Sequence, residues 1–183
     1  MDPRRRPIVV ALALAVATTG VILWLAIGSR PGCDGAHVAD GCRVPAIAGT
    51  TLEGSTFDFA SLAGHPVVVN FWGPSCVPCR DEFPLFLQKL DEHAGDGLAI
   101  VGVLMDDPPA PARTFIADYG ATWPTIEDPG KAIRTAYRAV ARPQTYFIDR
   151  DGILRGIQVG QLTDADFERL YAAISGPSAS AYP

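Results

Sequence analysis

Two cysteines, Cys76 and Cys79 in the motif CVPC, are the residues of this sequence best suited to chemistry. They follow an apolar run, 66–72, that predicts a buried strand, and they open an amphipathic pattern, 78–93, that predicts a helix. The first cysteine then lies at a helix N-terminus, where free N–H groups and the helix dipole stabilise a thiolate. Because the thiolate is the nucleophile of disulfide exchange, we expect Cys76 to attack a substrate disulfide and Cys79 to resolve the mixed disulfide.

Two other interpretations of this motif are a purely structural disulfide and half of a zinc site. A zinc site needs two further ligands at a finger-like spacing, and the sequence offers no convincing pair. The sequence therefore predicts redox chemistry at Cys76 and Cys79, with no metal and no cofactor.

The patterns along the rest of the chain predict one α/β domain with helices on both faces of a sheet. Strands are expected over 66–72, 98–105, 145–149 and 153–159, helices over 78–93, 111–119, 131–140 and 163–174, and a hairpin over 50–59. Hydrophobic residues make up 48% of the chain and charged residues 19%, so a packed core is expected. The formal net charge of -5 disfavours binding to nucleic acid, whose phosphates an acidic domain repels.

An uncharged apolar segment, 8–27, lies near the N-terminus. As a helix it would span about 30 Å, the thickness of the hydrocarbon core of a bilayer. Arginines at 4–6 precede it and only Arg30 follows, so the positive-inside rule predicts a single-pass anchor with the remaining chain outside the cytoplasm. The alternative is a signal peptide cleaved after the small residues 15–17, which also exports the domain.

These features divide the chain into four segments. The arginine cluster and anchor occupy 1–30, a juxtamembrane linker 31–45, the α/β domain 46–175 and a polar tail 176–183. The linker carries Cys33 and Cys42, which in an oxidising compartment are expected to form a loop-closing disulfide. The alternative is that this pair relays electrons to or from the CVPC motif.

The segment 71–84, FWGPSCVPCRDEFP, resembles the active-site segment of the TlpA/ResA/CcmG-like (DsbE-like) proteins. These are membrane-anchored, extracytoplasmic members of the thioredoxin-like superfamily. The resemblance continues in 142–149, RPQTYFID, and covers about 44–174. It implies a thioredoxin-like fold with an N-terminal hairpin and an extra helix between core strands.

The resemblance also implies roles for three residues. Pro143 would be a cis-proline facing the two cysteines, and the backbone of Arg142 would pair with a substrate strand; an ordinary trans proline is the alternative. Glu82 matches an acidic residue that the family keeps near its dithiol, where a carboxylate can exchange a proton with Cys79. The alternative for Glu82 is a solvated charge on the helix surface.

The sequence departs from the family pattern at two positions. Ser75 stands where the family usually has an aromatic residue, and Gln144 replaces the usual threonine after the cis-proline. Asn70 occupies the buried position where thioredoxins proper carry a carboxylate, which leaves Glu82 as the nearest candidate acid. The two departures bear on the choice of substrate more than on the reaction.

Taken with the resemblance, these residues predict a membrane-anchored thiol–disulfide oxidoreductase that reduces protein disulfides, apocytochrome c among the implied substrates. An integral-membrane thiol reductase would return the electrons. No histidine lies between the two cysteines, which favours a reducing couple. The alternatives are a disulfide-donating oxidase for secreted proteins and a redox-inert scaffold. A peroxidase of the peroxiredoxin type is disfavoured because Gly73, and not Thr or Ser, stands three residues before Cys76.

Overall fold

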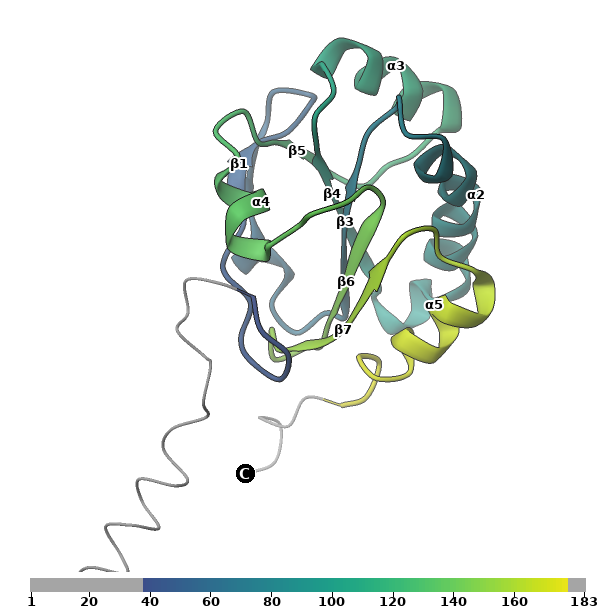
Figure 1. Ribbon diagram of the computed structural model, residues 1–183. Coiled ribbons are helices and arrows are strands. Elements are labelled where there is room, and N and C mark those ends of the chain that lie inside the picture. Colours follow the sequence, from purple (N-terminus) through teal and green to yellow (C-terminus); the bar gives the residue numbers. More distant parts are fainter. Residues whose placement is uncertain (1–37, 178–183) are drawn as a thin grey trace, which may run out of the picture. The chain divides into compact units, whose positions relative to one another are not determined.

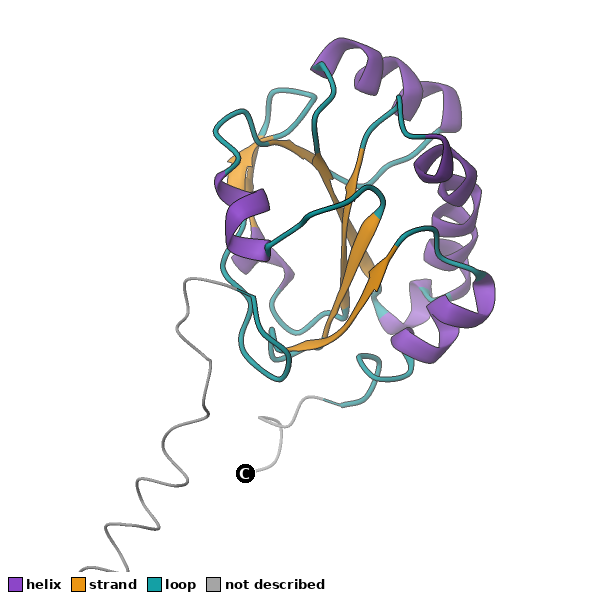
Figure 2. Cartoon of the chain, in the orientation of Figure 1, coloured by secondary structure: helices purple, strands orange, loops and turns teal. Residues whose placement is uncertain are grey.

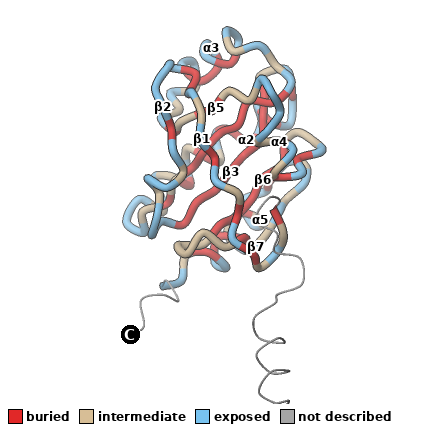
Figure 3. The backbone as a smooth tube through the Cα atoms, turned by 90° about the vertical axis from the view of Figure 1, so that its left-hand side faces the viewer, coloured by how far each residue is buried: buried red, intermediate tan, exposed pale blue. Residues whose placement is uncertain are grey.

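A mixed five-stranded sheet forms the centre of the domain in the computed structural model, which describes residues 38–177. The strand order is β5-β4-β3-β6-β7. The strands are β3 (Val67–Trp72), β4 (Ala99–Leu104), β5 (Thr125–Glu127), β6 (Gln144–Ile148) and β7 (Leu154–Val159). The central strand, β3, pairs in parallel with β4 and antiparallel to β6. Every residue of β3 is buried, as expected for a β-branched apolar strand covered on both faces (Figure 3).

Helices cover both faces of this sheet (Figures 1 and 2). Three of them, α2 (Val77–Glu92), α3 (Pro109–Tyr119) and α5 (Asp164–Tyr171), pack on one face through a core rich in aromatic rings. The other face is covered by α4 (Ala132–Tyr137) and by the hairpin of β1 (Ala48–Thr50) and β2 (Thr56–Asp58). Short 3-10 helices, η1 (Phe59–Leu62) and η2 (Ala94–Asp96), complete the set. The predicted α/β class, hairpin and helical layers are confirmed.

One strand was absent from the sequence prediction. β5 pairs in parallel with Gly102–Leu104 at the edge of the sheet. With only three residues it is too short for an alternating pattern to stand out, so tertiary pairing and not local sequence defines it.

Residues before the predicted start of the domain at residue 46 also pack against the sheet. Val38 and Val44 are buried in the core, although the composition of 31–45 is that of a linker. The main chain explains the difference: Val44 N donates to the Gly152 carbonyl, and Leu154 N donates to the Cys42 carbonyl. Backbone pairing with the start of β7 therefore orders residues whose side chains show no periodicity.

The predicted transmembrane span, 8–27, lies outside the described residues, as does Cys33. Within residues 38–177, none of the helices combines the length and the apolarity needed to cross a bilayer. Cys42 is disulfide-bonded.

A buried lysine joins α2 to α5. The side chain of Lys89 is only 3% exposed, and its Nζ lies 2.6 Å from Asp164 Oδ1, 2.6 Å from Glu168 Oε1 and 2.7 Å from Glu92 Oε2. Burial alone would lower the pKa of Lys89, but the hydrogen bonds that it donates to these carboxylates raise the pKa overall. The ammonium group is thus fully paired where helix α2 meets helix α5.

Replacing Lys89 by methionine is expected to lower the free energy of unfolding at pH 7 by roughly 2 kcal/mol, because the carboxylates then face one another without a cation. The pKa values of Glu92 and Glu168 are lowered, first of all by hydrogen bonds from Gln88 and Lys89 respectively. Their contribution is therefore present at neutral pH and is lost as the pH falls through those lowered values. Denaturant titrations at several pH values measure the loss.

Lys131→Met is the matched control, because this lysine is 65% exposed and its Nζ lies 3.8 Å from Asp106 Oδ1. We expect a change of less than about 0.5 kcal/mol for it. Equal losses for the two lysine variants would contradict a special role of Lys89.

Candidate active site

The CVPC motif lies where β3 ends and α2 begins. Cys76 and Cys79 form a disulfide with an S–S distance of 2.06 Å. Cys76 is the N-cap residue of α2, and its Sγ accepts a hydrogen bond from Cys79 N at 3.2 Å. Pro78 stands in the first turn, where a missing N–H costs no hydrogen bond. The N-terminus of α2 therefore directs towards the first sulfur both the helix dipole and an N–H group that has no partner within the helix.

The two cysteines differ in exposure. Cys76 is 9% exposed, whereas Cys79 is completely buried. A substrate disulfide can reach only a sulfur that is accessible from solvent, so Cys76 is placed to attack the substrate. Cys79 is placed to attack Cys76 Sγ from inside the protein and so to resolve the mixed disulfide.

Glu82 lies one helical turn after Cys79, and its side chain points into the protein. Its exposure is only 1%, so it is not the solvated surface charge of the alternative interpretation. Glu82 Oε1 accepts a hydrogen bond from Asn70 Nδ2 at 2.9 Å, and Oε2 accepts one from Leu162 N at 3.1 Å. Asn70 Nδ2 also donates to Thr145 Oγ1, on the strand that follows Pro143. The network thus joins β3, α2 and β6.

Burial raises the pKa of Glu82 from 4.5 to about 7, although the Leu162 N–H and the Asn70 amide both lower it. A carboxyl group with such a pKa exists in both protonation states near neutral pH. It can therefore accept a proton and return it within one reaction cycle.

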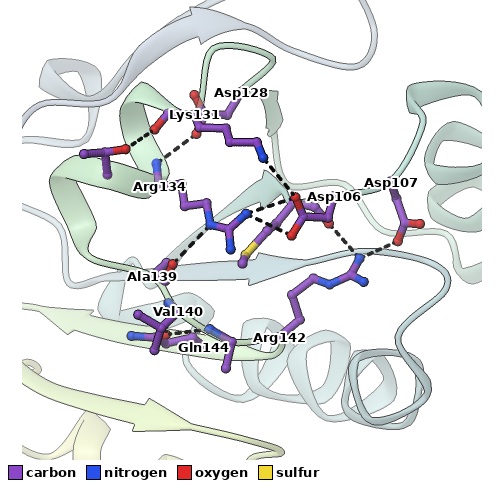
Figure 4. A network of polar contacts seen from close by, with 12 residues as sticks. Asp106, Asp107, Asp128, Lys131, Arg134, Ala139, Val140, Arg142 and Gln144 are labelled. Carbon is purple, nitrogen blue, oxygen red and sulfur yellow. Dashed lines mark hydrogen bonds and ion pairs between the residues drawn. The ribbon is translucent and has the colours of Figure 1, made fainter.

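The Arg142–Pro143 peptide bond is cis, as the resemblance implies. Pro143 is buried at the start of β6, and its carbonyl accepts a hydrogen bond from Gly160 N at 2.9 Å. The side chain of Gln144 holds the loop before it, because its Oε1 accepts from Val140 N at 2.9 Å and from Ala141 N at 3.3 Å (Figure 4).

Gln144 therefore explains a difference from the predicted helix over 131–140. Helix α4 ends at Tyr137, and Arg138 follows with a positive φ of 52°. The side-chain carbonyl of Gln144 accepts hydrogen bonds from the N–H groups of residues 140 and 141. These residues therefore form a loop instead of a further helical turn. The departure from threonine at this position thus supports the loop that carries Arg142.

Exposed apolar side chains occur in the CVPC motif and in the segments beside Gln144. Val77, between the two cysteines, is 64% exposed, and Val140, in the loop held by Gln144, is 76% exposed. Val159, on β7 opposite Gln144, is also exposed. Such side chains fit a protein surface better than a small polar ligand.

Away from the disulfide, one group of described residues has side-chain atoms close enough to hold a metal ion: Glu92, His93 and Glu168. Lys89 donates hydrogen bonds to both of these glutamates. The ammonium group thus already supplies the positive charge that a metal ion would bring.

Sequence reasoning did not find two residues that contact the site. Thr145 accepts a hydrogen bond from Asn70, and Asp107 accepts one from Ser75, the residue before Cys76. Each is distant in sequence from the motif, and no spacing rule connects them. Their partners, Asn70 and Ser75, were the only signals of these contacts in the sequence analysis.

The family follows from a match over most of the described domain. Residues 41–157 match the AhpC/TSA family. The chain belongs to the AhpC/TSA family. Among its relatives, the chain is 31% identical to thioredoxin-like protein YneN of Bacillus subtilis, over 72% of this chain and 78% of that protein. It is 30% identical to the thiol-disulfide oxidoreductase ResA of Geobacillus kaustophilus, over 72% and 76% of the two chains.

Solved structures of similar proteins share the fold. A thiol:disulfide interchange protein of the thioredoxin family from Chlorobium tepidum superposes with a TM-score of 0.68 at 28% identity, covering 75% of this chain and 99% of that one. A secreted Mycobacterium tuberculosis disulfide oxidoreductase homologous to DsbE gives a TM-score of 0.62 at 25% identity, covering 69% and 95%. With its Cys76–Cys79 pair, this AhpC/TSA-family chain is a thiol-disulfide oxidoreductase of the ResA/DsbE type with a thioredoxin-like fold.

Proposed function

We propose that this oxidoreductase is a membrane-anchored reductase of protein disulfides that works outside the cytoplasm, with the cysteines of apocytochrome c among its substrates. The observation that carries the reaction is the unequal pair of sulfurs, with Cys76 partly accessible, at 9% exposed, on a helix N-terminus and Cys79 fully buried. The exposed apolar side chains of Val77, Val140 and Val159 support a protein as the substrate.

In this reaction the Cys76 thiolate attacks one sulfur of the substrate disulfide, and the other substrate sulfur leaves as a thiolate. Cys79 then attacks Cys76 Sγ, which closes the Cys76–Cys79 disulfide and releases the second substrate thiolate. The buried carboxylate of Glu82 accepts the proton that Cys79 loses in this step. Pro143 presents the loop whose backbone, at Arg142, pairs with the substrate strand. Two electrons pass from the protein to the substrate in each cycle.

The reducing direction is supported by the residues between the cysteines. Val77 and Pro78 give no hydrogen bond or charge that would stabilise the reduced form, as strong oxidants require. A reductase outside the cytoplasm needs a supply of electrons, which we assign to an integral-membrane thiol reductase. The uncharged segment 8–27 supplies the anchor that brings the two together.

The redox state of the protein in its own cells tests this proposal. Acid quenching followed by alkylation should find Cys76 and Cys79 mostly reduced, in a protein that stays in the membrane after an alkaline wash. A mostly oxidised pair would instead support the disulfide-donating oxidase. Release from the membrane with an N-terminus after residue 17 would contradict the anchor.

A further inference from the structure

A single carboxylate oxygen connects the loop before Cys76 to the loop before Pro143. Asp107 Oδ2 accepts hydrogen bonds from Ser75 N at 3.1 Å, from Ser75 Oγ at 2.9 Å and from Arg142 Nη1 at 2.7 Å. Ser75 directly precedes Cys76, and Arg142 directly precedes the cis-proline. Asp107 itself lies in the loop between β4 and α3.

The ion pair of Asp107 and Arg142 lies directly against the backbone that leads to Cys76. A Cβ atom added at Gly73 would overlap both Asp107 Oδ2 and Arg142 Nη1. The two side chains are 9% and 21% exposed, and Arg142 Nη1 also donates to the Met105 carbonyl at 2.7 Å (Figure 4). Both charges are therefore held in place and partly shielded from water.

Charges at this place act on the sulfur that carries the reaction. A carboxylate hydrogen-bonded to the residue before Cys76 disfavours the Cys76 thiolate, and a guanidinium group beside it favours the thiolate. Side chains that are mostly withdrawn from water are screened less than surface charges, so each effect is substantial by itself. While the two side chains are bonded to each other, their opposite effects on the Cys76 thiolate largely cancel.

We propose that the Asp107–Arg142 ion pair sets the reduction potential of the Cys76–Cys79 couple, with each member offsetting the charge of the other beside Cys76. Neither side chain exchanges electrons or protons, so both are positioning residues. The proposal rests on Cys76 being the attacking sulfur, but it holds for either direction of electron flow.

The measured reaction is the equilibrium with glutathione. Two glutathione thiols supply two electrons to the Cys76–Cys79 disulfide, which becomes two thiols while one glutathione disulfide forms. Whatever stabilises the Cys76 thiolate stabilises the reduced protein and raises the potential. Removing the negative charge of Asp107 and removing the positive charge of Arg142 therefore have opposite expected effects.

Asp107→Asn isolates the charge, because one oxygen takes all three hydrogen bonds and the amide oxygen of asparagine can occupy its place. In the full-length chain we expect this variant to shift the glutathione equilibrium about fivefold towards the reduced protein, a rise of about 20 mV for two electrons. Arg142→Gln is expected to shift it about fivefold the other way. The double variant should return to within about twofold of the wild type, and Arg142→Lys should stay within the same limit.

The neighbouring ion pair provides a matched control. Asp106 accepts two hydrogen bonds from Arg134 Nη1, each 2.9 Å long, with the same charges as the first pair (Figure 4). Its contacts do not include the loop before Cys76. Asp106→Asn and Arg134→Gln are each expected to change the equilibrium by less than twofold.

A purely structural clamp predicts a different outcome. Loosening the loop from either side would move the equilibrium in the same direction for both single variants, while opposite shifts require the charges. Shifts of the same sign, or shifts below twofold in both variants, would overturn the proposal. A high potential in the wild type with opposite shifts in the variants would instead keep this proposal and reject the reductase.

Discussion

Replacing Cys79 by serine is expected to turn a transient intermediate into a stable product. Cys76, the more exposed of the two cysteines, still attacks the substrate disulfide, but no buried thiol remains to release it. Affinity purification of Cys79→Ser from cells should therefore yield substrate proteins joined to Cys76 by disulfides. Cys76→Ser should reduce insulin disulfides at less than about a thousandth of the wild-type rate, because it lacks the nucleophile.

The double variant Cys76→Ser/Cys79→Ser is the control for this trap and should capture no protein through a disulfide. Trapping by Cys76→Ser but not by Cys79→Ser would show that the roles of the two sulfurs are reversed. Wild-type insulin reduction by both single variants would remove the catalytic role of the motif.

Glu82→Gln is expected to slow the release of a mixed disulfide by on the order of 100-fold at pH 7, since the proton of Cys79 then has no buried acceptor. The rate in the wild type should rise with pH through about 7, the pKa to which burial raises the Glu82 carboxyl. Stopped-flow measurement of release from a preformed mixed disulfide, across pH 5 to 9, gives both results. Asp81→Asn, an exposed carboxylate beside it on α2, should leave the rate and its pH dependence unchanged.

The same carboxyl group should make the stability of the protein depend on pH. Because its folded-state pKa is raised, the protonated form is favoured in the folded protein, and stability falls as the pH rises from about 4.5 to about 7. This rise in the pKa of Glu82 corresponds to a loss of about 3 kcal/mol in the free energy of unfolding across that pH range. Glu82→Gln lacks this dependence, so the difference in unfolding free energy between variant and wild type should shift by about that amount in favour of the variant. A difference that stays constant with pH would contradict the raised pKa.

The sequence was informative where a function depends on residues that are adjacent along the chain. The CVPC motif between a buried strand and a helix predicted the place of the disulfide, because strand, turn and helix follow one another along the chain. Pro143 and Glu82 came from the resemblance to a known family, and neither position could be derived from spacing. The burial of Glu82 depends on Asn70 and Leu162, which approach it only when the sheet forms.

The contacts between distant loops had no sequence signal that could be used alone. Asp107 and Arg142 meet because β4 and β6 both lie beside β3, which brings the loops at their ends together. The packing of 38–45 and the edge strand β5 depend in the same way on backbone pairing with segments far along the chain. Gln144 stood out only as a departure from the family pattern, and its structural role required the geometry of the loop.

The reduction potential of the Cys76–Cys79 couple in the full-length protein, equilibrated with glutathione, tests the reductase most directly. The proposed function predicts a value near that of thioredoxin, about −270 mV, at which the dithiol reduces protein disulfides and requires a supply of electrons. A value near −120 mV, typical of a strong oxidant, would contradict the reductase and indicate that the protein donates disulfides instead.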